Sequence, residues 1–129
     1  MKDFPEFMRN PRNAIDPKLQ SPGNVGYVFD GIEGSQMAIW TSMEDVISGE
    51  HVHDFDEYFI VVEGEYKLKI SNKATVLRKG DEYHVPKEIP HSGESRKGTR
   101  TIYAFGSKRA KRVSEGEEVW RHHTARPCA

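Results

Sequence analysis

The sequence predicts an all-β fold, a sandwich or barrel of short strands, on two observations. Between Val25 and Phe105, short apolar runs alternate with turn residues at the spacing that is typical of such folds. No 11-residue window in this stretch shows the apolar stripe of an amphipathic helix. With 129 residues the chain is long enough for one hydrophobic core, so we expect a single domain.

Each strand is predicted from an apolar run that ends at turn residues. Pairs such as Asp30-Gly31, Glu63-Gly64 and Ser71-Asn72 mark these ends, because Gly and Asn adopt the backbone conformations that tight turns need. Pro86 stops a further run in the same way. In chain order, the expected strands are 26–30, 36–41, 46–53, 57–63, 65–71, 75–77, 82–85 and 99–105.

Two polar segments flank the predicted barrel domain, which we place at 25–106. Residues 1–24 contain four prolines, which favour an extended arm with at most a short helix near residues 4–9. Residues 107–129 form a short polar tail that opens with the basic run 108–112. This run is either a patch for an anionic partner or part of a solvated tail, and we favour the tail.

Composition argues against several classes of partner and location. A formal net charge of −1 gives no general attraction to nucleic acid or to a membrane surface. The N-terminus has no apolar run like that of a signal peptide, and no stretch reaches transmembrane length. The single cysteine, Cys128, cannot form an intrachain disulfide, and we take it as a bystander near the end. We therefore expect a cytoplasmic location.

The stretch from His51 to Glu57 has the composition of a metal site. Residues two apart on a strand face the same side, so His51 and His53 can direct both imidazoles toward one point. Glu57 can return to that side after a short irregularity. Two imidazoles and a carboxylate suit Fe, Mn, Ni, Cu or Zn. His91 is the candidate fourth ligand, if the strand that precedes it lies beside the His51 strand in an antiparallel barrel.

The joint spacing of these residues resembles the paired motifs of the cupin superfamily, in particular its small single-domain members. The motifs are HXH(X)3E(X)6G, with His51, His53, Glu57 and Gly64, and G(X)5P(X)4H, with Gly80, Pro86 and His91. Fifteen residues separate them. The resemblance covers 46–105 by motif and 25–41 by pattern. It departs from the family at three turn or edge positions, where Asp45 and Glu88 replace glycines and Ser95 replaces an asparagine.

This resemblance implies a double-stranded β-helix, or jelly-roll barrel, with one divalent metal ion inside. The ion, Fe, Mn, Ni or Zn, is expected on His51, His53, Glu57 and His91. Four ligands leave one or two coordination positions open, which indicates a metal-dependent enzyme acting on a small molecule. Dioxygenase or oxidase chemistry comes first and isomerase or lyase chemistry second. The alternative is a non-catalytic binding or sensing module, and an open cavity would favour the enzyme.

Further residues near the expected site have weaker assignments. The substrate-binding candidates on barrel strands are Phe59, Tyr83, Arg100 and Tyr103. Core packing is the common role for such aromatics, and exposure is the common outcome for a strand arginine. We expect a mostly apolar cavity with the metal as its polar anchor. The remaining candidates are His84, which should face away, Asp54 and Asp56, which suit either imidazole support or turns, and the tail residues His122 and His123.

A homodimer is expected from one strand. Residues 58–62 are apolar on both faces, although one face of a lone barrel usually meets water. Something must therefore cover Tyr58, Ile60 and Val62. The arm of residues 1–24, from the same chain or from a partner, is the candidate cover.

Overall fold

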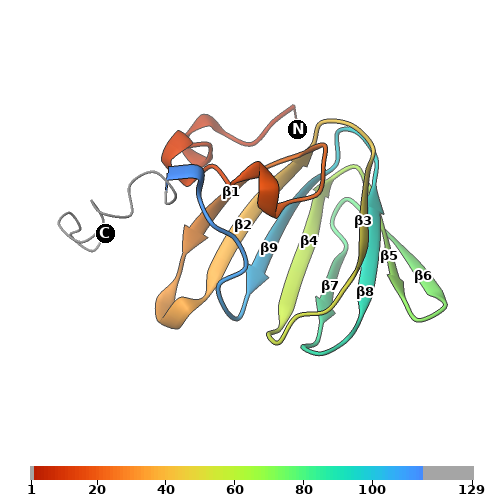
Figure 1. Ribbon diagram of the computed structural model, residues 1–129. Helices are drawn as coiled ribbons and strands as arrows, with labels where there is room; N and C mark the ends of the chain where they lie inside the picture. The colour runs from red at the N-terminus through yellow and green to blue at the C-terminus, as the bar shows by residue number, and fades with distance from the viewer. Residues whose placement is uncertain (1, 115–129) are drawn as a thin grey trace.

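Two antiparallel sheets packed face to face form the body of the protein (Figure 1). The computed structural model describes residues 2–114. The strands in that range are β1 (Asn24–Asp30), β2 (Gln36–Ser42), β3 (Val46–His51), β4 (Glu57–Glu63), β5 (Glu65–Ile70), β6 (Lys73–Arg78), β7 (Glu82–Val85), β8 (His91–Ser95) and β9 (Arg100–Phe105). The short 3-10 helices are η1 (Glu6–Met8), η2 (Pro11–Asn13), η3 (Pro17–Leu19) and η4 (Ile32–Gly34). Among these residues, no helix has the length and apolar character needed to cross a membrane.

The strand order is that of a jelly roll, or double-stranded β-helix. One sheet runs β1-β2-β9-β4-β7 and the other runs β3-β8-β5-β6, and all neighbouring strands are antiparallel. Strands that are distant in the chain therefore lie side by side, with β9 between β2 and β4 and β8 between β3 and β5. The predicted all-β jelly roll is confirmed.

One strand, β8, was not among the predicted strands. Its sequence, His91 to Ser95, contains no aliphatic or aromatic residue, so it shows no hydrophobic alternation. Its residues instead alternate in burial: His91, Gly93 and Ser95 are buried, and the residues between them are less buried. The expectation that the strand 82–85 lies beside the His51 strand is wrong: β7 pairs with β4, and β8 pairs with β3.

The core is built from the inward faces of both sheets. On β4, Glu57, Phe59 and Val61 are buried, whereas Tyr58 is 44% exposed, as the predicted strand phase requires. Phe59 stacks on Tyr103 with ring centroids 4.7 Å apart, and Trp40 meets Tyr103 edge-on at 5.2 Å. This aromatic packing holds β2, β4 and β9 in place around the inward-facing Glu57.

The N-terminal arm follows β1 rather than β4. Its two proline turns, η2 and η3, begin at Asn10 and Asp16, whose side chains accept hydrogen bonds from backbone N–H groups two residues on. Ala14 then bridges to Tyr27 on β1. The arm of this chain leaves Tyr58 exposed on β4, so the cover expected for that residue does not come from this contact.

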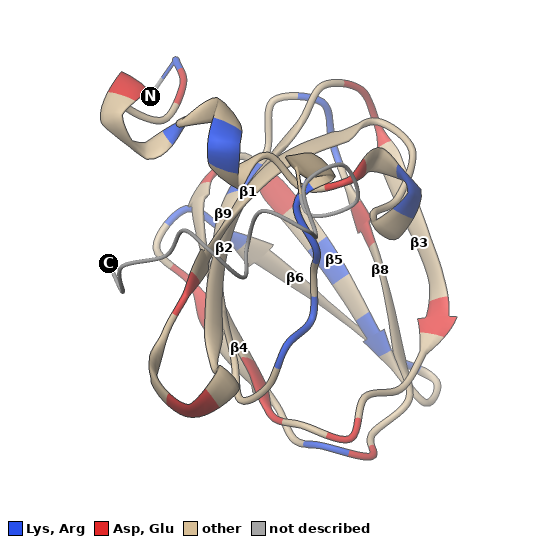
Figure 2. Ribbon diagram, turned by 60° about the vertical axis from the view of Figure 1, so that its left-hand side comes forward, with Lys and Arg blue, Asp and Glu red and all other residues tan. Residues whose placement is uncertain are grey.

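The basic run 108–112 packs against the protein, which corrects the expectation of a solvated tail. The amide of Asp16 donates to the carbonyl of Lys111 at 2.9 Å, and the amide of Val113 donates to the carbonyl of Ala14 at 3.0 Å. Arg112 forms an ion pair with Asp30 at 2.9 Å. Figure 2 shows this basic stretch running between the two sheets. The two terminal segments therefore pair with each other along one side of the barrel.

Candidate metal centre and its cavity

The β3–β8 pairing brings two predicted ligands together. His51 and His91 are direct partners in the register, after a β-bulge or similar irregularity between Ser48 and His51. His53 lies two residues beyond the end of β3, and Glu57 is the first residue of β4. One potential ligand atom from each of these four residues lies within 4.8 Å of the others. The expected ligand set is thus assembled at one point.

Backbone carbonyls orient two of the imidazoles. The Nδ1 atom of His51 lies 2.8 Å from the carbonyl oxygen of Gly49, and that of His91 lies 2.8 Å from the carbonyl oxygen of Ile89. A carbonyl oxygen only accepts, so each Nδ1 carries the hydrogen and each Nε2 keeps its lone pair. This is the arrangement in which a histidine presents Nε2 to a metal ion.

Glu57 sits between the imidazoles. It is 5% exposed, and its two carboxylate oxygens lie 3.4 Å from Nε2 of His53 and 3.7 Å from Nε2 of His91. Burial alone would raise the pKa of Glu57, but the two neighbouring imidazoles outweigh it and lower the pKa from 4.5 to about 2. The carboxylate is therefore ionised at neutral pH.

The buried nitrogens show that the residues fit a metal ion. Among residues 2–114, Nε2 of His53 and Nε2 of His91 are buried side-chain atoms without a hydrogen-bond partner. Burying a polar atom without a partner costs about 1–3 kcal/mol, and a metal ion at the centre of the cluster would remove that cost. Phe55 stacks on His53 with centroids 4.7 Å apart, which restrains that ring.

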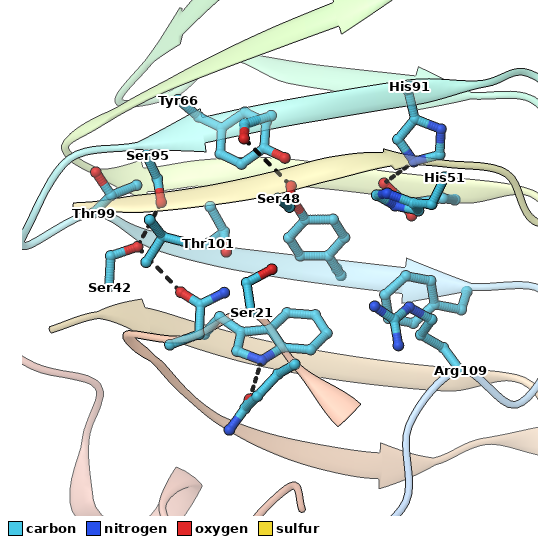
Figure 3. A pocket seen from close by; sticks show the side chains of 18 residues that line it. Ser21, Ser42, Ser48, His51, Tyr66, His91, Ser95, Thr99, Thr101 and Arg109 are labelled. Atoms are coloured by element: carbon cyan, nitrogen blue, oxygen red, sulfur yellow. Dashed lines mark hydrogen bonds and ion pairs between the residues drawn. The ribbon is translucent and has the colours of Figure 1, made fainter. Parts of the chain in front are cut away.

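A cavity open to solvent adjoins the cluster (Figure 3). Its empty space, which includes open solvent, is about 650 Å³, and His51, Glu57 and His91 line it. The expectation of a mostly apolar lining is wrong, because many side chains around the cavity carry hydroxyl groups. These are Ser21, Ser42, Ser48, Tyr66, Ser95, Thr99, Thr101 and Tyr103.

The substrate-binding candidates separate into one that lines the cavity and three that do not. Tyr103 lines it. Phe59 is buried in the core, and Tyr83 packs against that core from β7. Arg100 is out of phase with the inward-facing Thr101 and lies on the outer side, where it donates to the backbone carbonyls of Gly98 and Lys2. The assignments of Phe59, Tyr83 and Arg100 to substrate are therefore corrected.

Arg109 is the cavity residue that sequence reasoning missed. It lines the cavity from the basic run, which was assigned to the tail. Gln36, buried at the start of β2, holds this segment: its Oε1 accepts from the amides of Arg109 (2.6 Å) and Ala110 (2.9 Å), and its Nε2 donates to the carbonyl of Ala110 (3.0 Å). Gln36 is a polar residue at the first inward-facing position of its strand, and this feature of the sequence could have indicated such a contact.

The remaining histidine and aspartate candidates lie outside the cluster. The side chain of His84 is 52% exposed and approaches Asp56 at 3.3 Å, so it faces away as predicted. Asp56 also accepts a hydrogen bond from the amide of Lys87 at 3.0 Å, which is the turn-stabilising role expected as one of its two alternatives. Asp54 is exposed. His122, His123 and Cys128 lie outside the described residues.

The three departures from the family motifs are accommodated locally. Asp45 accepts from the amide of Lys97 at 2.8 Å. Glu88 keeps the positive φ, +68°, that a glycine would adopt without strain. Ser95 forms a 2.7 Å hydroxyl–hydroxyl hydrogen bond with Ser42. The amide of Glu88 also donates to the carbonyl of His53 at 2.7 Å, so this turn supports the backbone of a candidate ligand.

Comparison with known proteins agrees with this geometry. A family model described as Cupin domain matches residues 39–103, half of the chain and all four candidate ligands. No curated protein sequence matches the chain.

Several solved structures share the fold. A RmlC-like cupin from Shewanella frigidimarina NCIMB 400 aligns with a TM-score of 0.60 and 18% identity, over 72% of this chain and 92% of its own. KdgF from Halomonas sp. aligns with a TM-score of 0.60 and 16% identity, over 78% of this chain and 94% of its own. A salicylate 1,2-dioxygenase from Pseudoaminobacter salicylatoxidans aligns with a TM-score of 0.60 and 18% identity, over 65% of this chain and 25% of its own. At these identities the similarity establishes the fold alone.

Proposed function

The chain belongs to the cupin domain family, and on that premise we propose that it is a metal-dependent enzyme acting on a small polar molecule inside the barrel. The observation that carries this proposal is the open cavity that contains His51, Glu57 and His91. A metal that only stapled the barrel would not need a solvent-accessible cavity beside it. The open cavity therefore favours catalysis over a purely structural role for the metal, and a binding or sensing module remains the alternative.

Three histidines and one glutamate suit Fe, Mn, Ni or Zn, because neutral imidazoles with a single carboxylate form a site of borderline softness. A dedicated Ca²⁺ or Mg²⁺ site would use mostly oxygen ligands. When bound, such an ion supplies an open coordination position for O₂ or for polarising a substrate oxygen. We place oxidase or dioxygenase chemistry first and isomerase or lyase chemistry second.

We propose that the cavity's two tyrosines, whose hydroxyl groups hydrogen bond to each other, act together as a hydrogen-bond donor to a substrate. Burial raises the pKa of Tyr66, and burial also raises the pKa of Tyr103. Both phenols therefore stay protonated at neutral pH. Tyr103 also packs against Phe59 and Trp40, so its hydroxyl is held in a defined position.

Metal analysis of the freshly purified protein, paired with O₂-consumption assays, tests the proposal. The assays use a panel of small carbonyl compounds, diols and phenols, and mass spectrometry of the products detects isomerase or lyase turnover. We expect one transition-metal ion per chain and turnover that disappears in His91→Ala but persists in His84→Ala. A metal-loaded protein that converts no member of the panel would contradict the enzyme proposal and favour a binding module.

Location and assembly are proposed on sequence grounds. A cytoplasmic location is supported by the single cysteine, Cys128, because it cannot form an intrachain disulfide. A homodimer is supported by the apolar segment 58–62, of which Tyr58 is 44% exposed.

A further inference from the structure

Arg109 is a cationic side chain on the wall of the cavity. Figure 3 shows it opposite His51 and His91, at the same end of the cavity. In the part of the chain that the structure describes, no carboxylate lies within ion-pair distance of its guanidinium. Its Nη1 donates a long hydrogen bond, 3.4 Å, to the carbonyl of Leu19. Most of the guanidinium's donor capacity is therefore available to a molecule in the cavity.

The backbone that carries Arg109 is held firmly. Gln36, which is 2% exposed, forms three hydrogen bonds to Arg109 and Ala110. Three residues further on, Arg112 forms an ion pair with Asp30 and donates to the carbonyl of Val28 at 2.9 Å. A cation on a mobile tail would lose conformational entropy on binding a ligand, and this fixed backbone reduces that cost.

The charges of the cavity favour an anion. Apart from the histidines, the charged side chains of its lining are Glu57 and Arg109. Glu57 is enclosed by the imidazoles of His53 and His91 and does not neutralise the arginine. A divalent ion on the histidine cluster would make the cavity positive overall, which attracts anionic molecules.

The opposite end of the cavity offers hydroxyl groups. In Figure 3, Ser42, Ser95 and Thr101 lie together, away from His51 and Arg109. All three are buried. Ser42 and Ser95 already hydrogen bond to each other at 2.7 Å, but a hydroxyl oxygen can accept two hydrogen bonds, so the cluster keeps acceptor capacity for the hydroxyl groups of a ligand.

We propose that Arg109 binds the carboxylate of a small hydroxylated carboxylic acid, whose carbon chain extends toward Ser42 and Ser95. This assignment rests on the proposed function and names its substrate class. The planar guanidinium matches a carboxylate with two parallel hydrogen bonds. No second lysine or arginine lines the described cavity to share the larger charge of a phosphate ester, which is why we choose the carboxylate.

Three probes separate the two ends of the site in calorimetric titrations of metal-free protein. Gluconate carries both groups, sorbitol has the hydroxyls without the charge, and hexanoate has the charge without the hydroxyls. We expect wild-type protein to prefer gluconate, and Arg109→Gln to weaken gluconate and hexanoate binding at least tenfold without affecting sorbitol. Lys111→Gln is the matched control, because it removes one positive charge from the same segment at an exposed position.

Circular dichroism and melting curves confirm that each variant is folded. Equal gluconate affinity in wild type and Arg109→Gln, or no binding of either carboxylate to wild type, would overturn the carboxylate assignment. Equal affinity for gluconate and hexanoate would overturn the claim that the cavity binds the hydroxyl groups of the ligand. A phosphate ester such as glycerol 3-phosphate binding more tightly than gluconate would overturn the choice of carboxylate.

Metal analysis and turnover assays test the proposed function, whereas gluconate binding tests the carboxylate site, so the two proposals can fail independently. If metal binds and turnover occurs while Arg109→Gln binds gluconate normally, the carboxylate site fails and the metal enzyme stands. If no metal binds but gluconate binding still depends on Arg109, the metal enzyme fails and the carboxylate site stands.

Discussion

The histidines of the candidate metal centre are held in orientation by different contacts. His51 and His91 are oriented by backbone carbonyls, while His53 is restrained by the ring of Phe55. These three restraints persist when one of the four side chains is replaced. Glu57 also contacts His53 and His91, and the imidazoles pack on one another, so a substitution can also shift its neighbours.

We predict that His53→Ala and His91→Ala each lower metal affinity more than about 100-fold. Loss of residues that only support a metal ligand costs about 10–100-fold, and these two residues provide ligand atoms themselves. Elemental analysis after dialysis measures the occupancy. His84→Ala is the control, because that side chain faces solvent. If His84→Ala lost the metal and His91→Ala kept it, the ligand assignment would be wrong.

The pH dependence of metal binding follows from the histidines. A metal ion binds neutral imidazole, so a protonated ring must first lose its proton. Burial lowers the pKa of His51. Burial also acts to lower the pKa of His91, but Glu57 and the Ile89 carbonyl outweigh it and raise the value above 6.5. His91 thus takes up its proton before His51 as the pH falls.

We predict that metal affinity falls as the pH decreases, beginning above pH 6.5 because the pKa of His91 is raised, by about tenfold per pH unit for each proton displaced. Titrations of the metal-free protein at pH values above and below 6.5 measure this slope. His84→Ala should show the same slope as wild type. Affinity that does not change with pH would mean that no ligand histidine carries a proton in this range.

The clustering of the four candidate ligands could be predicted from the sequence because they occur in motifs of fixed spacing, two of them close together around the end of one strand. Arg109 could not be predicted in this way. Its position depends on Gln36, which lies 73 residues earlier in the chain, and no local pattern records that contact. Arg100, by contrast, could have been excluded, because Thr101, Tyr103 and Phe105 occupy the inward phase of β9.

At the scale of elements, β8 is a strand without hydrophobic residues. Its inward positions carry a candidate metal ligand, a glycine and a hydroxyl group, so the apolar pattern from which strands are predicted is absent. The other strands retain that pattern and could be predicted from the sequence. The strand that brings His91 to His51 is therefore the one that sequence periodicity cannot reveal.

Gly93 on β8 allows Tyr66 to reach the cavity. A Cβ atom at position 93 would lie 2.0 Å from the Tyr66 hydroxyl oxygen and 2.4 Å from its Cζ. We predict that Gly93→Ala displaces the tyrosine and lowers the free energy of unfolding by about 1–3 kcal/mol, as overpacking does. Urea denaturation measures the change.

Gly49→Ala is the control for that substitution. Gly49 lies on β3, the partner strand of β8, and a Cβ atom at position 49 would meet no atom within 4 Å apart from its chain neighbours. We expect its effect to stay within about 0.5 kcal/mol. Equal stability of the Gly93→Ala and Gly49→Ala proteins would show that Tyr66 moves aside without cost.

At the scale of the whole molecule, the outer face of β4 remains partly uncovered. Tyr58 is 44% exposed, and Ile60 and Val62 are half-buried. The homodimer expected from these residues stays a prediction. Light scattering at micromolar concentration should give about twice the chain mass of 14.8 kDa.

We expect Tyr58→Asp to shift the protein toward the monomer, because it places a charge in the proposed interface. Ile47→Asp is the control, because Ile47 is also exposed but lies on β3 in the other sheet. A monomeric mass for the wild-type protein would refute the dimer.

The pairing of the two terminal segments has a consequence for the order of folding. The contacts of Asp16 with Lys111 and of Ala14 with Val113 join residues that are separated by nearly the whole described chain. Closing such a long loop carries the largest entropy cost of any pairing in the fold, so we expect it to form last. The amides of Asp16 and Val113 should then exchange with deuterium faster than those joining β2 to β9. The wall that carries Arg109 would open by local unfolding while the barrel stays intact, and ligand exchange would follow the rate of that opening.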